Sequence, residues 1–198
     1  MPRFLPYLFS ALILGLLIGG PLAYSSYRNR AFRHFHVVEP GILYRSGQMT
    51  LDGLKRVMHD HGIKTVITLR AAAHPDQPPP DLKEEEYCRS EELNYYRITP
   101  KPWSASDGSV PAAQGVKLFL KVMRDPANYP VLIHCFAGIH RTGAYCAVYR
   151  MEFHHWDNAR AIAEVVAHGY SNLDTEEDLL GYLENYRPAW RTEAEDEP

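Results

Sequence analysis

The stretch "VLIHCFAGIHRTG", residues 131 to 143, decides the fold predicted for this chain of 198 residues. Val131 to His134 close an apolar run, which is typical of a short buried strand. Two glycines then allow a tight turn, after which the chain can continue as a helix from Thr142 onward. Cys135 stands between strand and turn, and Arg141 follows six positions later. The order predicts a strand, a tight loop and a helix.

A loop of this kind favours an anion. It points several backbone N–H groups at one spot, just ahead of a helix N-terminus. Arg141 adds a planar guanidinium that can hold two oxygens of a phosphate. The same surroundings lower the pKa of a cysteine from ~8.5 to ~3.5–7.5, so Cys135 is expected to be a thiolate, and Thr142 can donate its hydroxyl to it. The residues expected to surround the phosphate are Phe136, Ala137, Gly138, Ile139, His140 and Arg141.

Strand and helix patterns alternate through the rest of the chain. Helix patterns cover residues 51–62, 82–93 and 112–125, and the second of these helices is expected to face solvent. Strand patterns cover residues 41–46, 64–70, 94–99 and 130–135. This alternation predicts an α/β fold with a central, mostly parallel sheet flanked by helices. Ligands bind such sheets beyond the carboxyl ends of the strands, where Cys135 lies.

The residues "HCFAGIHRTG" resemble the His-Cys-x5-Arg-Ser/Thr-Gly signature of the cysteine-dependent protein tyrosine phosphatase superfamily. The resemblance covers roughly Val37 to Pro188, a length nearer the compact dual-specificity members than the larger tyrosine-specific enzymes. It implies that the Cys135 thiolate attacks phosphorus and forms a phosphocysteine, which water then hydrolyses. It also implies that neither a metal ion nor another cofactor is needed, because Arg141 and the loop N–H groups neutralise the transferred group.

The resemblance further implies an aspartic acid that protonates the leaving oxygen. We predict Asp107, which lies 28 residues before Cys135 in the loop ahead of the helix at 112–125. Its surroundings, "WSASDGS", depart from the family's usual Trp-Pro-Asp, so this assignment rests on spacing. Asp76 is the alternative, because it also follows the carboxyl end of a strand. A purely structural role for Asp107, as a turn residue beside Gly108, stays open.

Composition excludes two classes of function. The net charge is -3 and the basic residues are spread along the chain, so no nucleic-acid-binding face is expected. The cysteines form no CxxC pair, so neither a disulfide framework nor a zinc site is expected, and Cys88 and Cys146 are predicted to be structural. His34 and His36 are expected at the surface. Arg45 is expected either to reach the site from a neighbouring strand or to form a surface ion pair.

The first 24 residues differ from the rest of the chain. Phe4 to Tyr24 carry no charged side chain and are close to the ~20 residues that cross a bilayer. They predict a single-pass membrane anchor, with a cleaved signal peptide as the alternative. Arginines after this segment would place the following domain in the cytoplasm. The predicted boundaries are residues 1–24 for the anchor, 25–36 for a polar linker, 37–188 for the phosphatase domain and 189–198 for an acidic tail.

The predicted substrate is a protein carrying phosphotyrosine, or also phosphoserine or phosphothreonine. A phosphoinositide or inositol phosphate phosphatase of the same fold is an alternative, since an anchor would hold the domain at a phospholipid surface. Against it, the loop has no lysine to meet extra phosphates. A phosphate-binding protein without turnover is a further alternative, which depends on whether Asp107 works as the acid.

Overall fold

A five-stranded sheet forms the centre of the structure, a computed structural model that describes residues 5–191. The strand order is β1-β2-β5-β3-β4, and β1 alone among them pairs antiparallel with its neighbour. The mostly parallel α/β fold is therefore confirmed, although the edge strand β1 was not predicted. The strands are β1 (His36–Glu39), β2 (Leu43–Ser46), β3 (Thr65–Thr68), β4 (Asn94–Arg97) and β5 (Val131–His134).

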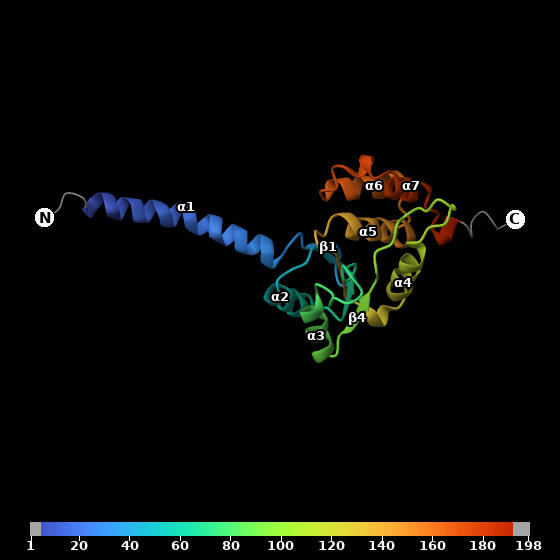
Figure 1. The fold of residues 1–198 in the computed structure, drawn as a ribbon, viewed down its shortest axis with the longest axis horizontal. Helices are drawn as coiled ribbons and strands as arrows, with labels where there is room; N and C mark the ends of the chain where they lie inside the picture. The colour runs from blue at the N-terminus through green and yellow to red at the C-terminus, as the bar shows by residue number, and fades with distance from the viewer. Residues whose placement is uncertain (1–4, 192–198) are drawn as a thin grey trace.

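Helices cover both faces of the sheet (Figure 1). Side chains alternate along the central strands, so that Leu132 of β5 faces one helical layer and Ile133 faces the other. One layer holds α2 (Leu51–His61) and α3 (Leu82–Ser90). The other layer holds α4 (Ala113–Met123), α5 (His140–Phe153), α6 (Asn158–Ala167) and α7 (Glu177–Asn185), with two short 3-10 turns at η1 (Pro126–Asn128) and η2 (Leu173–Thr175).

Helix α2 follows the sequence pattern closely. Leu54, Val57 and Met58 are buried on one face. The side chain of Thr50 accepts a hydrogen bond from the N–H of Gly53 at the start of the helix. Gly62 ends it in the left-handed conformation, with φ of 61°. The amphipathic pattern and its end signal were enough to predict this helix.

The stretch from β5 into α5 also has the predicted order of strand, loop and helix. Gly138 lies in the loop with φ of 79°, and a Cβ there would overlap the backbone of Ser46 and Gly47. The loop after β5 is therefore packed directly against the loop after β2. Because the two strands run parallel, both loops leave the same edge of the sheet.

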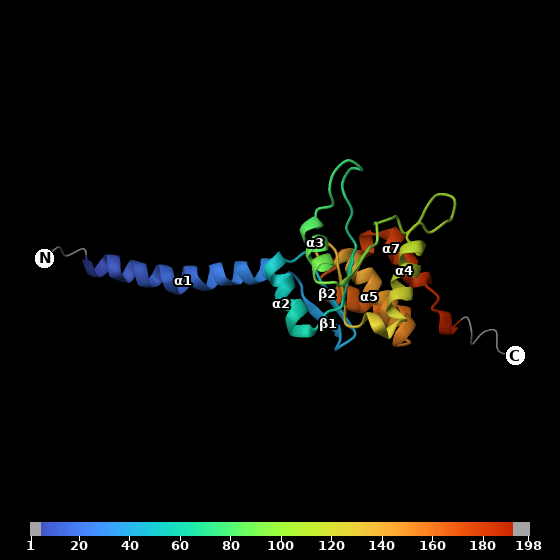
Figure 2. The same cartoon turned by 90° about the horizontal axis from the view of Figure 1, so that it is seen from below.

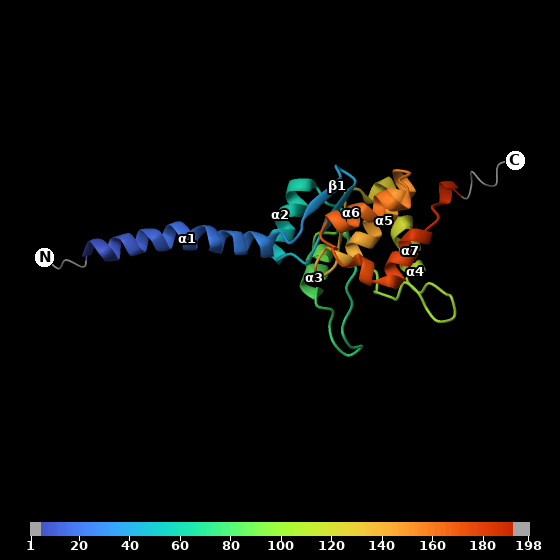
Figure 3. The same ribbon diagram turned by 90° about the horizontal axis from the view of Figure 1, so that it is seen from above.

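A long helix, α1 (Leu5–Ala31), projects away from the rest of the molecule (Figures 1 to 3). It continues into the segment 25–36 that we predicted to be a polar linker, so this segment is helical up to Ala31. Ala31 is buried against Gly53 of α2, where a Cβ would overlap its carbonyl. This contact joins the end of α1 to the domain built around the sheet.

Among the described residues, no helix combines the length and the hydropathy that a membrane crossing requires. The anchor predicted over residues 1–24 thus gains no support, and residues 1–4 of it lie outside the described residues. At the other end, the indole N–H of Trp190 donates to the carbonyl of Met151 at 2.7 Å. The predicted acidic tail, 189–198, therefore begins as part of the domain, and its residues 192–198 lie outside the described residues.

Candidate active site

Cys135 lies at the carboxyl end of β5 and is only 3% exposed. Burial acts to raise its pKa, but hydrogen bonds from Thr142 and from the N–H of Gly138, with the nearby charge of His134, lower the pKa below its usual value. The Gly138 N–H is 3.2 Å from the sulfur. The Thr142 hydroxyl is fully buried, and no oxygen or nitrogen of the described residues bonds it. The geometry thus favours a thiolate.

Three neighbouring segments tie back carbonyl groups of the loop. The Arg45 guanidinium donates to the Gly138 carbonyl at 2.8 Å, the Gln48 N–H donates to Phe136 at 2.9 Å, and Nδ1 of His34 donates to Ala137 at 2.7 Å. These carbonyls are therefore held away from an anion bound at the loop. Arg45 is buried, so the surface ion pair suggested for it is wrong, and it reaches the site from β2. His34 is exposed, as predicted, but it also supports the loop.

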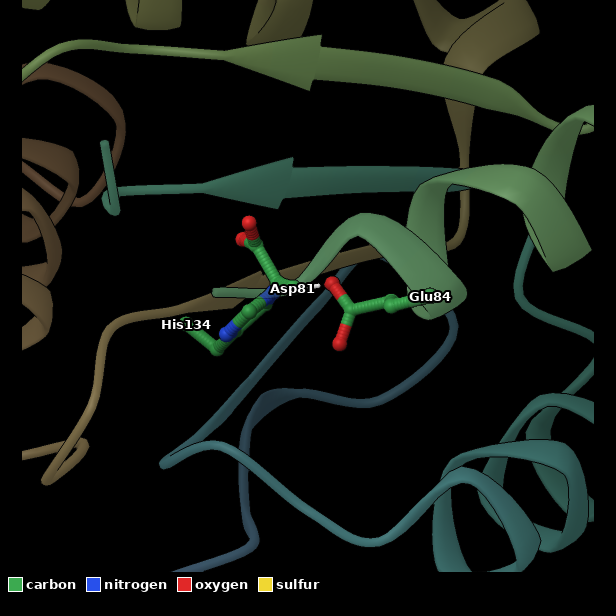
Figure 4. Close-up of side chains that lie close together, drawn as sticks. All are labelled: Asp81, Glu84 and His134. Carbon is green, nitrogen blue, oxygen red and sulfur yellow. Dashed lines mark hydrogen bonds and ion pairs between the residues drawn. The ribbon is translucent and has the colours of Figure 1, made fainter. Parts of the chain in front are cut away.

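His134 is bonded to the carboxylate of Glu84 in α3, and Asp81 lies close by at the start of that helix (Figure 4). Its Nε2 lies 2.6 Å from Oε1 of Glu84, and both side chains are buried. Burial acts to lower the pKa of His134, but the charge and hydrogen bond of Glu84 raise the pKa overall. Tyr95 and Gln48 also donate to Glu84. The sequence predicted α3 to face solvent and gave no sign of this contact, which connects residues 50 positions apart.

Asp81, Glu84 and His134 bring their polar atoms within 4.8 Å of one another, which raises the question of a metal site. Arg97 answers it, because its guanidinium lies 2.6 Å from Asp81 and would repel a cation. Thr68 and Tyr95 donate to the same carboxylate of Asp81. The cluster therefore suits a hydrogen-bonded ion-pair network beneath the loop.

The outer residues of the loop face solvent. Arg141 is exposed, and its Nη1 donates to the carbonyl of Leu69 at 3.3 Å. Phe136 is 55% exposed, with Arg33 4.2 Å and Arg70 5.2 Å from its ring centroid. The ring of His140 stacks on Tyr170. Ile139 is half-buried beside Gly169.

Neither candidate acid touches the loop in this conformation. Asp107 is exposed in a turn where its carboxylate accepts a hydrogen bond from the N–H of Ser109 at 2.9 Å, and the Ser109 side chain and N–H together lower the pKa of Asp107. Asp76 is exposed in the loop between β3 and α3. Figures 2 and 3 show both loops extending from the body of the domain. Among the described residues, no hydrogen bond or ion pair joins either aspartate to residues 135–141.

The other two cysteines are buried and not bonded to each other or to Cys135. Burial raises the pKa of Cys88 to about 12 and the pKa of Cys146 to about 11. Both thiols are therefore protonated at neutral pH, and their pKa values move in the opposite direction to that of Cys135. This agrees with the structural role predicted for them.

Residues 34–179 match the family described as DSP-PTPase phosphatase fused to NAD+ kinase. The chain belongs to this phosphatase family. The match includes every residue from β1 to the start of α7, and with it the whole loop after Cys135. The resemblance found in the sequence is thereby confirmed.

The chain is similar to several curated proteins, among them one from yeast and one from a bacterium. The tyrosine-protein phosphatase-like protein OCA2 of Saccharomyces cerevisiae is 27% identical over 117 residues, which cover 59% of this chain and 55% of that protein. The dual specificity protein phosphatase TpbA of Pseudomonas aeruginosa is 24% identical over 185 residues, which cover 89% of this chain and 78% of that protein. The match thus spans about half of the yeast protein and most of the bacterial one.

Solved structures share the fold. The catalytic core of the PP-IP phosphatase SIW14 from S. cerevisiae has a TM-score of 0.60 at 21% identity, covering 82% of this chain and 90% of that one. TpbA in complex with phosphotyrosine has a TM-score of 0.56 at 20% identity, covering 80% of this chain and 91% of that one. At these identities the similarity shows the fold alone.

Proposed function

We propose that the chain hydrolyses phosphate monoesters through a phosphocysteine on Cys135, as a protein tyrosine or dual-specificity phosphatase. The observation that carries this proposal is the buried sulfur with a lowered pKa inside a loop whose carbonyls are tied back. Arg141 and the free loop N–H groups would bind the phosphate oxygens and neutralise their charge. No metal ion or other cofactor enters this scheme.

The reaction then proceeds in two steps. The Cys135 thiolate attacks phosphorus, the bond from phosphorus to the leaving oxygen breaks, and an aspartic acid gives that oxygen its proton. Water next attacks the phosphocysteine, its proton passes to the aspartate, and the bond from sulfur to phosphorus breaks. The Thr142 hydroxyl stabilises the departing thiolate, which agrees with its position beside the sulfur.

Asp107 is the proposed acid, and its loop must move to serve. Pro100, Lys101 and Trp103, at the base of that loop, line a small cavity together with Arg141, so the base of the loop borders the site. Trp103 is anchored by ring contacts with Tyr145. The Asp107 carboxylate must leave Ser109, because the side chain and N–H of that residue lower its pKa, whereas an acid that donates a proton needs a raised one. A rotation of the loop about its base at Trp103 would bring Asp107 toward the phosphate loop and release its carboxylate from Ser109.

Phosphotyrosine in proteins is the first substrate class that we propose. The exposed ring of Phe136 offers an aromatic surface at the edge of the loop. TpbA was solved with phosphotyrosine, and SIW14 is described as a PP-IP phosphatase, so this fold accommodates both protein and small-molecule phosphates. The protein substrate agrees with the dual-specificity name of the bacterial relative.

The proposal is tested with the full-length chain and a small aryl phosphate. We expect hydrolysis, and we expect Cys135→Ser to reduce it by roughly 10³-fold or more, because the nucleophile is lost. Cys146→Ala is the matched control, since it removes a buried, protonated thiol, and it is expected to retain turnover. Equal rates for Cys135→Ser and the unaltered chain would remove Cys135 from the mechanism.

Membrane attachment and a cytoplasmic location remain predictions from the sequence. They require residues 1–24 to act as an anchor, and the free thiolate of Cys135 would persist best in a reducing compartment. Fractionation of cells that express the chain with and without residues 1–24 tests both. Recovery of the full-length chain in the soluble fraction would remove the anchor from the proposal.

A further inference from the structure

Arginines without a carboxylate partner gather around the phosphate loop. Elsewhere, Arg97 and Arg150 each lie within 2.8 Å of a carboxylate oxygen. By contrast, four arginine side chains near the loop make no ion pair with any described residue. Arg70 donates a hydrogen bond to Gln48, and Arg141 donates one to a carbonyl. These unpaired side chains are Arg30, Arg33, Arg70 and Arg141. The surface beside Cys135 therefore carries positive charge that the described part of the chain does not neutralise.

A cavity of about 530 Å³ lies where the end of α1 meets the loop after β2. Arg30, Arg33, His34 and Gln48 are among the residues that line it. It borders the phosphate loop, because His34 and Gln48 bond directly to carbonyls of that loop. A molecule whose phosphate is bound at the loop can therefore extend toward this cavity and its two arginines.

The chain makes a turn at His34, one of the residues that line this cavity. His34 adopts φ of 45°, a left-handed conformation that is disfavoured for a residue with a side chain. The carbonyl of Arg33, the residue before it, accepts a hydrogen bond from the N–H of Gly47 at 2.7 Å. The turn thus brings Arg33 and the end of α1 against the loops at the edge of the sheet. The bond from His34 to Ala137 and the bond from Gly47 to Arg33 hold the turn in this position.

We propose that Arg30 and Arg33 form a second phosphate-binding site, which selects substrates that carry another phosphate group beside the one that is hydrolysed. This inference rests on the proposed phosphatase function. A guanidinium binds two oxygens of a phosphate at once, and two unpaired guanidinium groups beside an open cavity suit a dianion. The loop itself has no lysine that could bind a further phosphate. The structure supplies the missing positive charge from α1 and the turn after it.

The test compares kcat/KM for singly and doubly phosphorylated substrates, using the full-length chain. A phosphotyrosine peptide is paired with a doubly phosphorylated peptide, and an inositol monophosphate is paired with an inositol bisphosphate. We expect the second phosphate to raise kcat/KM by about tenfold or more in at least one pair, mainly through a lower KM. The pair that shows the increase identifies a peptide or a small molecule as the source of the second phosphate.

The quantity compared is the ratio of kcat/KM for the doubly phosphorylated substrate to kcat/KM for the singly phosphorylated one. Arg30→Gln is expected to lower this ratio about tenfold, and Arg33→Gln is expected to do the same. Arg28→Gln is the matched control, because Arg28 lies on the same helix but lines a different cavity, with Tyr24 and Phe32. It removes the same charge and should leave the ratio unchanged. A ratio near one in the unaltered chain, or a ratio that survives both Arg30→Gln and Arg33→Gln, overturns the second site while turnover persists. Loss of turnover on every substrate would instead overturn the proposed function.

Discussion

The loop after Cys135 and the loop that carries Asp107 differ in how they are held. The first is supported from three sides by Arg45, Gln48 and His34. The second has local contacts at its tip, where Gly108 donates to Ala105 and Asp107 accepts from Ser109. The binding and nucleophilic half of the proposed site is thus formed in advance, whereas its acid half must be brought in. Preorganised donors stabilise a transition state without rearranging, so the fixed half is where rigidity contributes most.

Among changes that separate the two loops, the largest effect is expected from Asp107→Asn. If the loop delivers the acid, this change should slow hydrolysis of a phosphate ester with a poor leaving group by roughly 10²–10⁴-fold. An aryl phosphate with a good leaving group should lose less, since that leaving group needs less protonation. Rates on the two substrates, measured side by side, give the comparison.

Asp76→Asn is the control for Asp107→Asn. Asp76 is also an exposed aspartate in a projecting loop, and its change should leave the rate near that of the unaltered chain. The opposite pattern, with loss in Asp76→Asn alone, would assign the acid to the loop between β3 and α3. Unchanged rates in both variants would show that neither Asp107 nor Asp76 is the acid.

Substitution of one glycine in each loop by alanine compares how tightly the two loops are packed. Gly138 and Gly108 both have φ of 79°, but a Cβ at Gly138 would overlap backbone, whereas a Cβ at Gly108 meets nothing within 4 Å. We expect Gly138→Ala to lower the free energy of unfolding by about 3 kcal/mol, the sum of backbone strain and overpacking. Gly108→Ala should cost only about 1 kcal/mol from strain. Urea unfolding of both variants measures this, and equal losses would refute the difference in packing.

A smaller effect is expected when the support beneath the loop is weakened. Glu84 raises the pKa of His134, and the charge of His134 in turn lowers the pKa of Cys135. In Glu84→Gln, His134 loses its proton at lower pH, so the pKa of Cys135 rises. The acidic limb of the pH profile of kcat/KM should therefore move to higher pH. Glu86→Gln, an exposed change on the same helix, should not move it, and an unmoved limb in Glu84→Gln would disprove the coupling.

Local patterns predicted the parts of the fold and site that depend on short-range interactions. The apolar face of α2 and the end signal at Gly62 gave that helix, and the strand, glycine and arginine order around Cys135 gave the loop. Contacts between distant segments had no local signal. The pairing of His134 with Glu84, the support of the loop by Arg45 and the burial of Ala31 against Gly53 all depend on how the sheet brings its elements together.

The proposed acid, Asp107, shows the same limit of sequence-based prediction. Spacing placed Asp107 in a loop near the site, and the base of that loop does border Arg141. The structure holds the carboxylate itself in an exposed turn, because local hydrogen bonds satisfy it there. Sequence spacing can locate such a loop, but it cannot give the conformation that delivers a proton.

The most direct test of the central claim is to trap the intermediate. The full-length chain is mixed with an aryl phosphate, quenched in acid within one turnover, digested and examined by mass spectrometry. We predict a phosphate group on Cys135 that disappears as turnover completes, and that is missing from Cys135→Ser. Turnover with no phosphorylated Cys135 at any time, or with phosphate on another residue, would contradict the proposed mechanism.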